Sequence, residues 1–295
     1  MIVNRTVVLL FGAVFLLCAN TTSASNPAVE IIPDVVYGHK AGMALTFDIL
    51  KPREKATGSA VLFMVSGGWF SNWNPPEQIY EKAVKEDGFL SRLVDHGHTV
   101  FLVRHGSAPQ FKVPEAVADV HRAVRFVRAN AKSYGIDSDR IGVCGGSAGG
   151  HLSLMLGTAS DEGKSDAKDP IERISDRVAA VVAYYPPTDL RGIVGPSQRF
   201  PALDFDPALA EGVSPLLHVT PDDPPTLLIH GDKDELVKLK QSEQIHEAFR
   251  KTGVTSEMIV IEGAAHGFKG DDNIRASKAL VEWFDKYLSK KNLEK

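Results

Sequence analysis

The segment Gly145-Gly146-Ser147-Ala148-Gly149 holds a hydroxyl group between glycines. A serine hydroxyl is a weak nucleophile unless a base lies beside it, and it is often presented on a tight strand-to-helix turn where glycines avoid Cβ clashes. Residues 140–144 are typical of a short buried strand, and residues 149–156 can open a helix. This is the context that a nucleophile elbow requires. The pattern predicts a nucleophilic Ser147, although three fixed positions in five also occur by chance in glycine-rich loops.

A nucleophilic serine needs an imidazole as its base and a carboxylate that orients the imidazole. In a strand-turn-helix elbow of this kind, the acid and then the histidine are expected after the serine. The histidines after Ser147 are His151, His218, His230, His246 and His266. His266 follows a predicted strand in a loop of small residues, whereas the others fall on helices, at a strand end or in an irregular stretch. We therefore predict that His266 is the base.

The predicted acid lies in His230-Gly231-Asp232-Lys233-Asp234, which follows an apolar strand and offers two carboxylates. We predict Asp234 as the residue that orients His266. Asp232 is two residues nearer the strand, and a helix cap or turn residue is the simpler interpretation of it.

The electrophilic part of the site is expected in Ser66-Gly67-Gly68-Trp69, the loop after the predicted strand 60–65. Backbone N–H groups of Gly67 and Gly68, together with that of Ala148, are predicted to form an oxyanion hole.

Two residues are predicted to bind substrate, Trp69 and Tyr185. The aromatic residues Trp69, Phe70 and Trp73 fit the wall of an acyl pocket as well as an ordinary core. Residues 186–214 are long for a plain connection and rich in Pro, Gly and Asp. We interpret them as a cap or lid-like insertion, with an irregular surface loop as the alternative.

The elements that must position these residues alternate between strands and helices from about residue 35 to the end, which predicts one α/β domain over residues 25–295 with a mostly parallel sheet flanked by helices. The expected strands are 35–37, 43–50, 60–65, 99–103, 140–144, 178–183, 226–230 and 257–261. Helices are expected at 75–96 with a break at 87–88, from 114 onward, and at 272–288. The charged segment 160–176 is expected to be a surface excursion.

Composition excludes some classes of function. The 295 residues are 43% hydrophobic and 24% charged, with a formal net charge of −4, which is typical of a globular protein with a sizeable core. Because acidic and basic residues are interspersed, a nucleic acid partner is not expected. The composition leaves the oligomeric state open.

The first residues predict an exported protein, periplasmic or secreted. Arg5 precedes the apolar run 7–17, and small residues follow at 22–24, so residues 1–24 are predicted to be a cleaved signal peptide with no membrane attachment afterwards. A membrane anchor is the alternative, although the run is short for a span. Cys18 leaves a lipid anchor as a minor option. After cleavage only Cys144 remains, as a buried thiol, so no intramolecular disulfide is expected.

Taken in order, the motifs resemble α/β-hydrolases of the esterase/lipase branch, near secreted carboxylesterases that include acetylxylan and feruloyl esterase-like enzymes. The resemblance covers roughly residues 35–288. It rests on the loop at 66–69, the elbow at 145–151, Ser214-Pro215, the segment 230–234 and His266-Gly267-Phe268. The family's loop usually contains His-Gly-Gly-Gly-Trp, and here Val65 and Ser66 replace its first two residues.

This resemblance implies a serine carboxylic ester hydrolase with a Ser-His-Asp triad and an acyl-enzyme, acting on small-acyl or carbohydrate esters and needing no metal or cofactor. One alternative is a small peptidase or acylaminoacyl hydrolase similar to prolyl oligopeptidase domains, although the chain has no room for their propeller. A catalytically silent hydrolase fold used for binding is the other.

Overall fold

A central sheet of eight strands carries the site. The computed structural model describes residues 28–290, so the predicted signal peptide at 1–24 lies outside the described residues. The strands are β1 (Val29–Lys40), β2 (Met43–Pro52), β3 (Ala60–Met64), β4 (Thr99–Val103), β5 (Ile141–Gly146), β6 (Ala180–Tyr184), β7 (Thr226–Gly231) and β8 (Ser256–Ile261). Their order in the sheet is β1-β2-β4-β3-β5-β6-β7-β8. Strands β1 and β2 pair antiparallel, as do β2 and β4, and the other neighbours are parallel.

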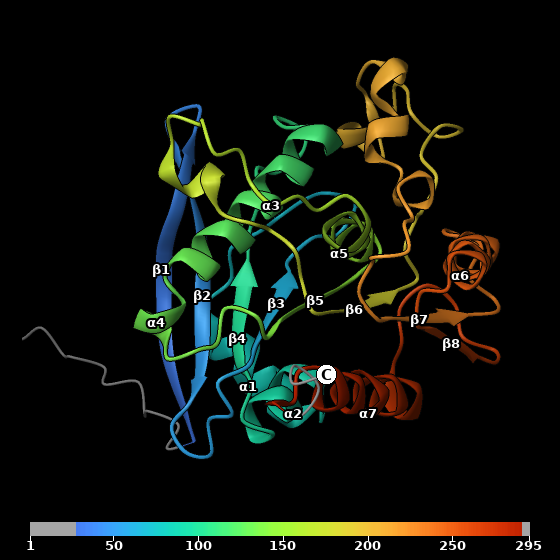
Figure 1. Cartoon of the computed structure of the whole chain (residues 1–295). Helices are drawn as coiled ribbons and strands as arrows, with labels where there is room; N and C mark the ends of the chain where they lie inside the picture. Colours follow the sequence, from blue (N-terminus) through green and yellow to red (C-terminus); the bar gives the residue numbers. More distant parts are fainter. Residues whose placement is uncertain (1–27, 291–295) are drawn as a thin grey trace, which may run out of the picture.

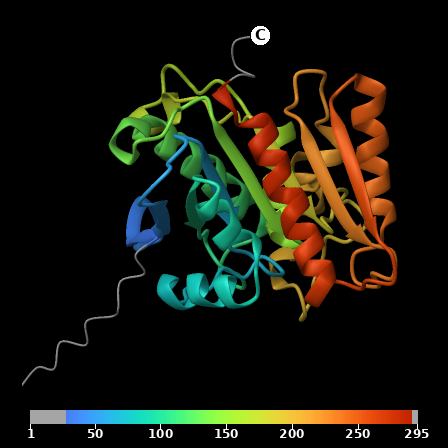
Figure 2. The same cartoon turned by 90° about the horizontal axis from the view of Figure 1, so that it is seen from below.

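Helices cover both faces of this sheet (Figures 1 and 2). They are α1 (Pro76–Lys85), α2 (Phe89–Asp95), α3 (Val113–Ala129), α4 (Ala131–Tyr134), α5 (Ala148–Thr158), α6 (Lys240–Thr252) and α7 (Gly270–Tyr287). Buried side chains of α3, α5 and α6 join one hydrophobic cluster, and those of α1, α2 and α7 join the cluster on the other face. The predicted α/β architecture is therefore confirmed.

Two local predictions show why the chain adopts these helices. The helix predicted over 75–96 is broken where expected, since Asp87 has a positive φ of 51° and Gly88 caps α2. In α3, the stripe Val117, Val120, Val124 and Val127 is buried against the sheet. Burial of such a stripe stabilises an amphipathic helix on its sheet.

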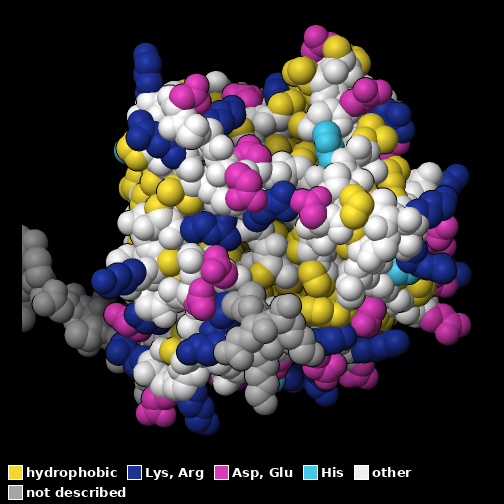
Figure 3. All heavy atoms as spheres, viewed as in Figure 1, with side chains coloured by type: hydrophobic (Ala, Val, Ile, Leu, Met, Phe, Trp, Pro, Cys, Tyr) yellow, Lys and Arg dark blue, Asp and Glu magenta, His cyan; other side chains and the backbone are white. Residues whose placement is uncertain are grey.

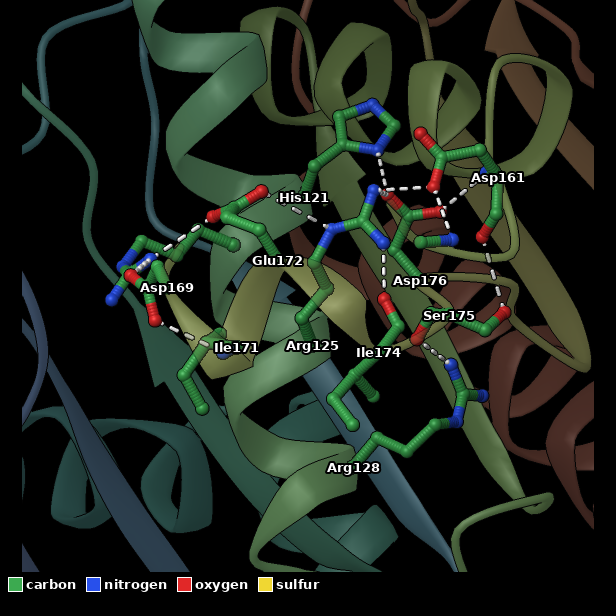
Figure 4. Close-up of polar contacts among 12 residues, drawn as sticks. His121, Arg125, Arg128, Asp161, Asp169, Ile171, Glu172, Ile174, Ser175 and Asp176 are labelled. Atoms are coloured by element: carbon green, nitrogen blue, oxygen red, sulfur yellow. Dashed lines mark hydrogen bonds and ion pairs between the residues drawn. The ribbon is translucent and has the colours of Figure 1, made fainter. Parts of the chain in front are cut away.

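The charged segment 160–176 is fastened to α3 by a buried ionic network (Figure 4). The Arg125 guanidinium lies 2.7 Å from Asp161 Oδ1 and 2.6 Å from Asp176 Oδ2. Asp176 is fully buried and also accepts a hydrogen bond from His121 Nδ1 at 2.7 Å. Arg128 donates to the Ser175 carbonyl at 2.5 Å. The segment 160–176, which was expected to be a surface excursion, is thus anchored to α3 through some of its charged side chains.

The face of the molecule seen in Figure 3 carries basic and acidic side chains intermixed, as the sequence suggested. Over residues 28–290, no helix combines the length and the apolar character needed to cross a membrane.

Candidate active site

Ser147 lies at the junction of β5 and α5, with a positive φ of 55°. A non-glycine residue held in this region is strained, and such strain persists only where the surroundings enforce it. The surroundings are tight here: a Cβ at Gly145 would lie 2.4 Å from the carbonyl carbon of Gly149, and one at Gly149 would lie 2.6 Å from the Met64 carbonyl oxygen. The glycines at 145 and 149 therefore permit the turn that presents the serine.

The structure brings the three predicted catalytic residues together. His266 Nε2 lies 3.0 Å from Ser147 Oγ, and His266 Nδ1 lies 2.7 Å from Asp234 Oδ2. An ionised carboxylate only accepts hydrogen bonds, so Nδ1 carries a proton and donates a hydrogen bond to Asp234. The lone pair of Nε2 then faces the serine hydroxyl. This is the arrangement in which an imidazole can remove a proton from a serine.

Asp234 is held in place by groups that the sequence did not single out. Its side chain is fully buried, and Oδ1 accepts the N–H groups of Leu236 and Val237, both at 2.9 Å. His230 Nε2 lies 3.3 Å from Oδ2 and donates to the Val237 carbonyl at 2.8 Å. In the sequence, His230 stands out only as the end of a predicted strand. Its position four residues before the acid was the one available signal.

Asp232 binds the loop that carries His266 rather than the imidazole of His266 itself. Its Oδ1 accepts the N–H of Gly263 at 2.6 Å, and the neighbouring Lys233 N–H donates to the Ala264 carbonyl at 3.0 Å. Both bonds fix the loop that carries His266. Asp234 is thus the aspartate that reaches the histidine, and Asp232 is a turn residue.

The oxyanion loop is a tight turn in which Gly68 and Trp69 have positive φ values of 59° and 60°. Gly67 and Phe70 exchange both backbone hydrogen bonds across it, each at 3.0 Å. The N–H of Gly67 is therefore occupied, and the expectation that it serves as an oxyanion donor is corrected. Within the described part of the chain, the N–H groups of Gly68 and Ala148 have no acceptor. Of the three N–H groups predicted to form the oxyanion hole, those of Gly68 and Ala148 are therefore free to donate.

The atypical Val65-Ser66 approach to this loop is braced by a buried histidine. His105 Nδ1 lies 2.9 Å from the Gly106 carbonyl, to which it must donate, so Nε2 accepts the Ser66 hydroxyl at 2.8 Å. Ser71 Oγ donates to the Val65 carbonyl at 2.6 Å. Burial lowers the pKa of His105 to about 4, which keeps the imidazole neutral near pH 7.

Trp69 links the loop at residues 66–69 to α5, the helix that follows Ser147. Its side chain is only 4% exposed, and its indole N–H donates to His151 Nδ1 at 3.3 Å. His151 Nε2 donates to the Val213 carbonyl at 2.7 Å, and burial lowers the pKa of His151 to about 4. The expectation that Trp69 binds substrate is therefore revised, because its ring lies in the core and acts as a brace. Trp73 is exposed and donates to Asp34.

The two neutral histidines predict a dependence of stability on pH. Because His105 and His151 have depressed pKa values in the folded protein, the unfolded chain binds more protons between pH 6.5 and about 4. The contribution of these two histidines to the free energy of unfolding is fully present above pH 6.5. It is lost as the pH decreases through that window, by up to about 3 kcal/mol for each histidine. Denaturant unfolding of the wild type and His105→Asn at several pH values checks this, and a variant with an undiminished slope contradicts it.

Tyr185, the other predicted substrate-binding residue, lies beside His266. Its backbone has a positive φ of 35°, and its ring centroid is 4.6 Å from that of His266. Burial, followed by the charge of Asp234, raises the pKa of Tyr185 to about 12. No acceptor or donor among residues 28–290 contacts its hydroxyl. The hydroxyl lies near Gly146, on the wall of a small cavity.

Residues 186–214 form short 3-10 turns rather than a separate cap of helices: Pro201–Leu203, Pro207–Leu209 and Glu211–Val213. They nevertheless adjoin the oxyanion loop, since a Cβ at Gly68 would lie 3.0 Å from the ring of Phe200. Ser214 anchors the segment by donating to the Ala210 carbonyl at 2.7 Å and accepting the Leu190 N–H at 2.9 Å. Contact of this segment with substrate stays a prediction.

The chain matches a known protein family. The BD-FAE family model matches residues 47–249. The chain belongs to the BD-FAE family. Among curated relatives, Mycobacterium tuberculosis "Esterase LipC" is 29% identical over 82% of this chain and 60% of its own length. "Esterase LipQ" from the same organism is 30% identical over 86% of this chain and 61% of its own. The chain thus spans about three-fifths of the length of these relatives.

Solved structures agree with this membership. A truncated form of a carbohydrate esterase from gut microbiota superposes with a TM-score of 0.72 at 25% identity, covering 90% of this chain and 98% of that chain. Thermogutta terrifontis esterase 2 phosphorylated by paraoxon gives 0.68 at 27% identity, covering 89% and 94%. For this BD-FAE member, the expected α/β-hydrolase family is confirmed, and the relatives and structural neighbours named above are esterases.

Proposed function

We propose that the chain is a serine carboxylic ester hydrolase in which Ser147, His266 and Asp234 form the catalytic triad. The observation that carries this proposal is the pair of contacts made by His266, at 3.0 Å to Ser147 Oγ and 2.7 Å to Asp234 Oδ2. Esterases among the relatives and structural neighbours support the same chemistry.

In the first half of the reaction, Ser147 Oγ attacks the ester carbonyl while His266 Nε2 takes its proton. Asp234 stabilises the imidazolium and keeps its Nδ1–H directed at the carboxylate. The carbonyl oxygen becomes an oxyanion that accepts the N–H groups of Gly68 and Ala148, with about 3 kcal/mol of transition-state stabilisation for each donor. His266 then gives its proton to the leaving alcohol, which leaves the acyl group on Ser147.

In the second half, water replaces the alcohol. His266 removes a proton from this water, the resulting hydroxide attacks the acyl carbonyl, and the same donors hold the second oxyanion. Collapse of this intermediate returns the proton to Ser147 and releases the carboxylic acid. The residues of the site supply every proton transfer in the cycle.

For the substrate we propose small-acyl or carbohydrate esters. The support is the carbohydrate esterase among the structural neighbours and the small cavity lined by Gly146, Tyr185 and Phe268 next to Ser147. We also propose that the protein is exported, on the signal-like sequence at residues 1–24.

Matched ester and amide substrates test the reaction class. We expect 4-nitrophenyl acetate to be hydrolysed with a kcat/KM at least about 100-fold above that of 4-nitroacetanilide. The amine is a poorer leaving group than the phenolate, and in the proposed mechanism His266 alone protonates it. Steady-state kinetics with both substrates gives the ratio. A preference for the anilide, or for dipeptide anilides, would favour the peptidase alternative instead.

A further inference from the structure

The far end of the loop at residues 66–69 is held by the segment that follows β4. The Ala108 N–H donates to the Trp69 carbonyl at 3.1 Å. Gly68, whose N–H is one of the two proposed oxyanion donors, precedes this anchor by one residue. The direction of the Gly68 N–H therefore depends on Trp69 and on whatever holds the residues before Gly68.

The start of the loop is held by a buried pair, Ser66 and His105. The Ser66 hydroxyl donates to His105 Nε2 at 2.8 Å, and His105 Nδ1 donates to the Gly106 carbonyl at 2.9 Å. The same peptide segment is fixed from α3, because the Gly106 N–H donates to Asp119 Oδ2 at 2.8 Å and the Asp119 side chain is buried. These bonds set both the place of the imidazole and the tautomer that accepts the serine hydroxyl.

The glycines that follow Ser66 have little other support from side chains. Among the described residues, no atom beyond the chain neighbours lies within 4 Å of the position that a Cβ would take at Gly67. The hydrogen bonds between Gly67 and Phe70 close the turn, but they lie within it and do not fix its place in the site. Because a shift of about 1 Å in a positioned group can lower a rate about 100-fold, the anchor at Ser66 matters for the Gly68 N–H.

The structure contains a second pair of the same kind at the opposite end of the same two strands. Ser59 precedes β3 and His98 precedes β4, and Ser59 Oγ lies 2.6 Å from His98 Nδ1. Both residues are buried, and 39 residues separate the serine from the histidine in each of the two pairs. Ser59 lies at the amino end of these parallel strands, whereas the elbow follows the carboxyl end of β5. The second pair therefore offers a buried serine–histidine contact outside the site.

We propose that His105 and Ser66 are positioning residues for the oxyanion: the imidazole, through the serine hydroxyl, holds the loop so that the Gly68 N–H is directed at the carbonyl oxygen of the substrate. The inference rests on the proposed ester hydrolysis. Both residues act through the backbone of Gly67 and Gly68 rather than by contact with the substrate. The proposal assigns a function to the serine that stands here in place of the family's usual glycine.

Ser66→Ala and Ser59→Ala are the matched pair of variants, because each removes one buried hydroxyl from a serine–histidine contact. Both should lower the melting temperature by roughly a few degrees. Only Ser66→Ala should lose activity, with kcat for 4-nitrophenyl acetate about tenfold lower, which is less than the loss of a whole oxyanion donor. Its KM should stay within about twofold, because both halves of the reaction use the same donors. Ser59→Ala should keep the wild-type kcat.

Two variants of the histidine separate positioning from packing. His105→Leu removes the acceptor of the Ser66 hydroxyl and should lose about as much kcat as Ser66→Ala. His105→Gln should recover most of that loss, because a carboxamide oxygen can accept the hydroxyl in place of Nε2. The double variant Ser66→Ala/His105→Leu should lose no more kcat than either single variant, since the two residues act as one pair.

The inhibitor 1,1,1-trifluoroacetone reports on the oxyanion site itself. Ser147 Oγ adds to its carbonyl carbon while His266 takes the serine proton, so the carbonyl oxygen becomes an oxyanion and no group leaves. Its inhibition constant should rise about tenfold in Ser66→Ala and stay unchanged in Ser59→Ala. Folded Ser66→Ala with the wild-type kcat and inhibition constant, or an equal loss of kcat in Ser59→Ala, overturns the positioning role while ester hydrolysis stands. A wild type that does not hydrolyse 4-nitrophenyl acetate overturns the proposed function, and the positioning role with it.

Discussion

Replacing Ser147 by alanine is expected to lower kcat/KM for 4-nitrophenyl acetate by at least about 10⁴-fold, because no acyl-enzyme can form without the hydroxyl. Substrate binding and the oxyanion donors remain, so a small residual rate above the uncatalysed reaction is expected. The melting temperature should stay within a few degrees of the wild type, since the hydroxyl contacts only His266 among the described residues.

The control for this variant is Ser165→Ala, which removes an exposed hydroxyl in the charged segment 160–176. It should keep the full wild-type rate. Steady-state kinetics and thermal unfolding of both variants provide the comparison. If folded Ser147→Ala kept more than a tenth of the wild-type activity, another residue would have to be the nucleophile.

Replacing Asp234 by asparagine is expected to lower kcat by about 10⁴-fold, an effect comparable with loss of the nucleophile. An asparagine can turn its NH₂ group toward His266, which then favours the tautomer with the proton on Nε2, facing the serine. The imidazole in that form cannot accept the serine proton, and the imidazolium also loses its neighbouring charge. His230 and the N–H groups of Leu236 and Val237 would lose a charged acceptor as well.

Asp232→Asn is the matched comparison, because it changes the other carboxylate of the same turn. Asp232 accepts the Gly263 N–H and does not contact His266, so we expect a loss of less than about tenfold in kcat. Kinetics of the two variants side by side distinguishes the roles. A larger loss in Asp232→Asn than in Asp234→Asn would mean that the acid of the triad has been misassigned.

Much of the fold could be predicted because many of its strands and helices have simple patterns of apolar residues. The apolar runs at 60–65, 99–103 and 226–230 are buried strands, and the valine stripe after Pro114 is a buried helix face. The break at 87–88 followed from Asp-Gly chemistry. Strand β1 is longer than predicted. It lies at the edge of the sheet, where polar residues are tolerated, so its sequence lacks the regular alternation of apolar and polar residues that would predict its full length.

The approach of Ser147, Asp234 and His266 could also be predicted from the sequence, because the order of serine, acid and histidine along the chain follows the strand order of this architecture. What the sequence could not show is which backbone N–H groups are already occupied. The turn that uses the Gly67 N–H depends on the positive φ angles of Gly68 and Trp69, and glycine alone does not specify a partner. The burial of Trp69 could not be predicted from the sequence either, because its hydrogen-bond partner His151 lies 82 residues away along the chain.

Covalent labelling of Ser147 is the measurement that tests the central claim most directly. The folded wild-type protein is treated with a fluorophosphonate, its intact mass is measured, and the modified peptide is sequenced by mass spectrometry. We predict one adduct for each chain, located on Ser147, and its loss in the unfolded protein and in His266→Ala. Absence of an adduct from the folded protein, or an adduct on a different residue, would contradict the assignment of Ser147 as the nucleophile.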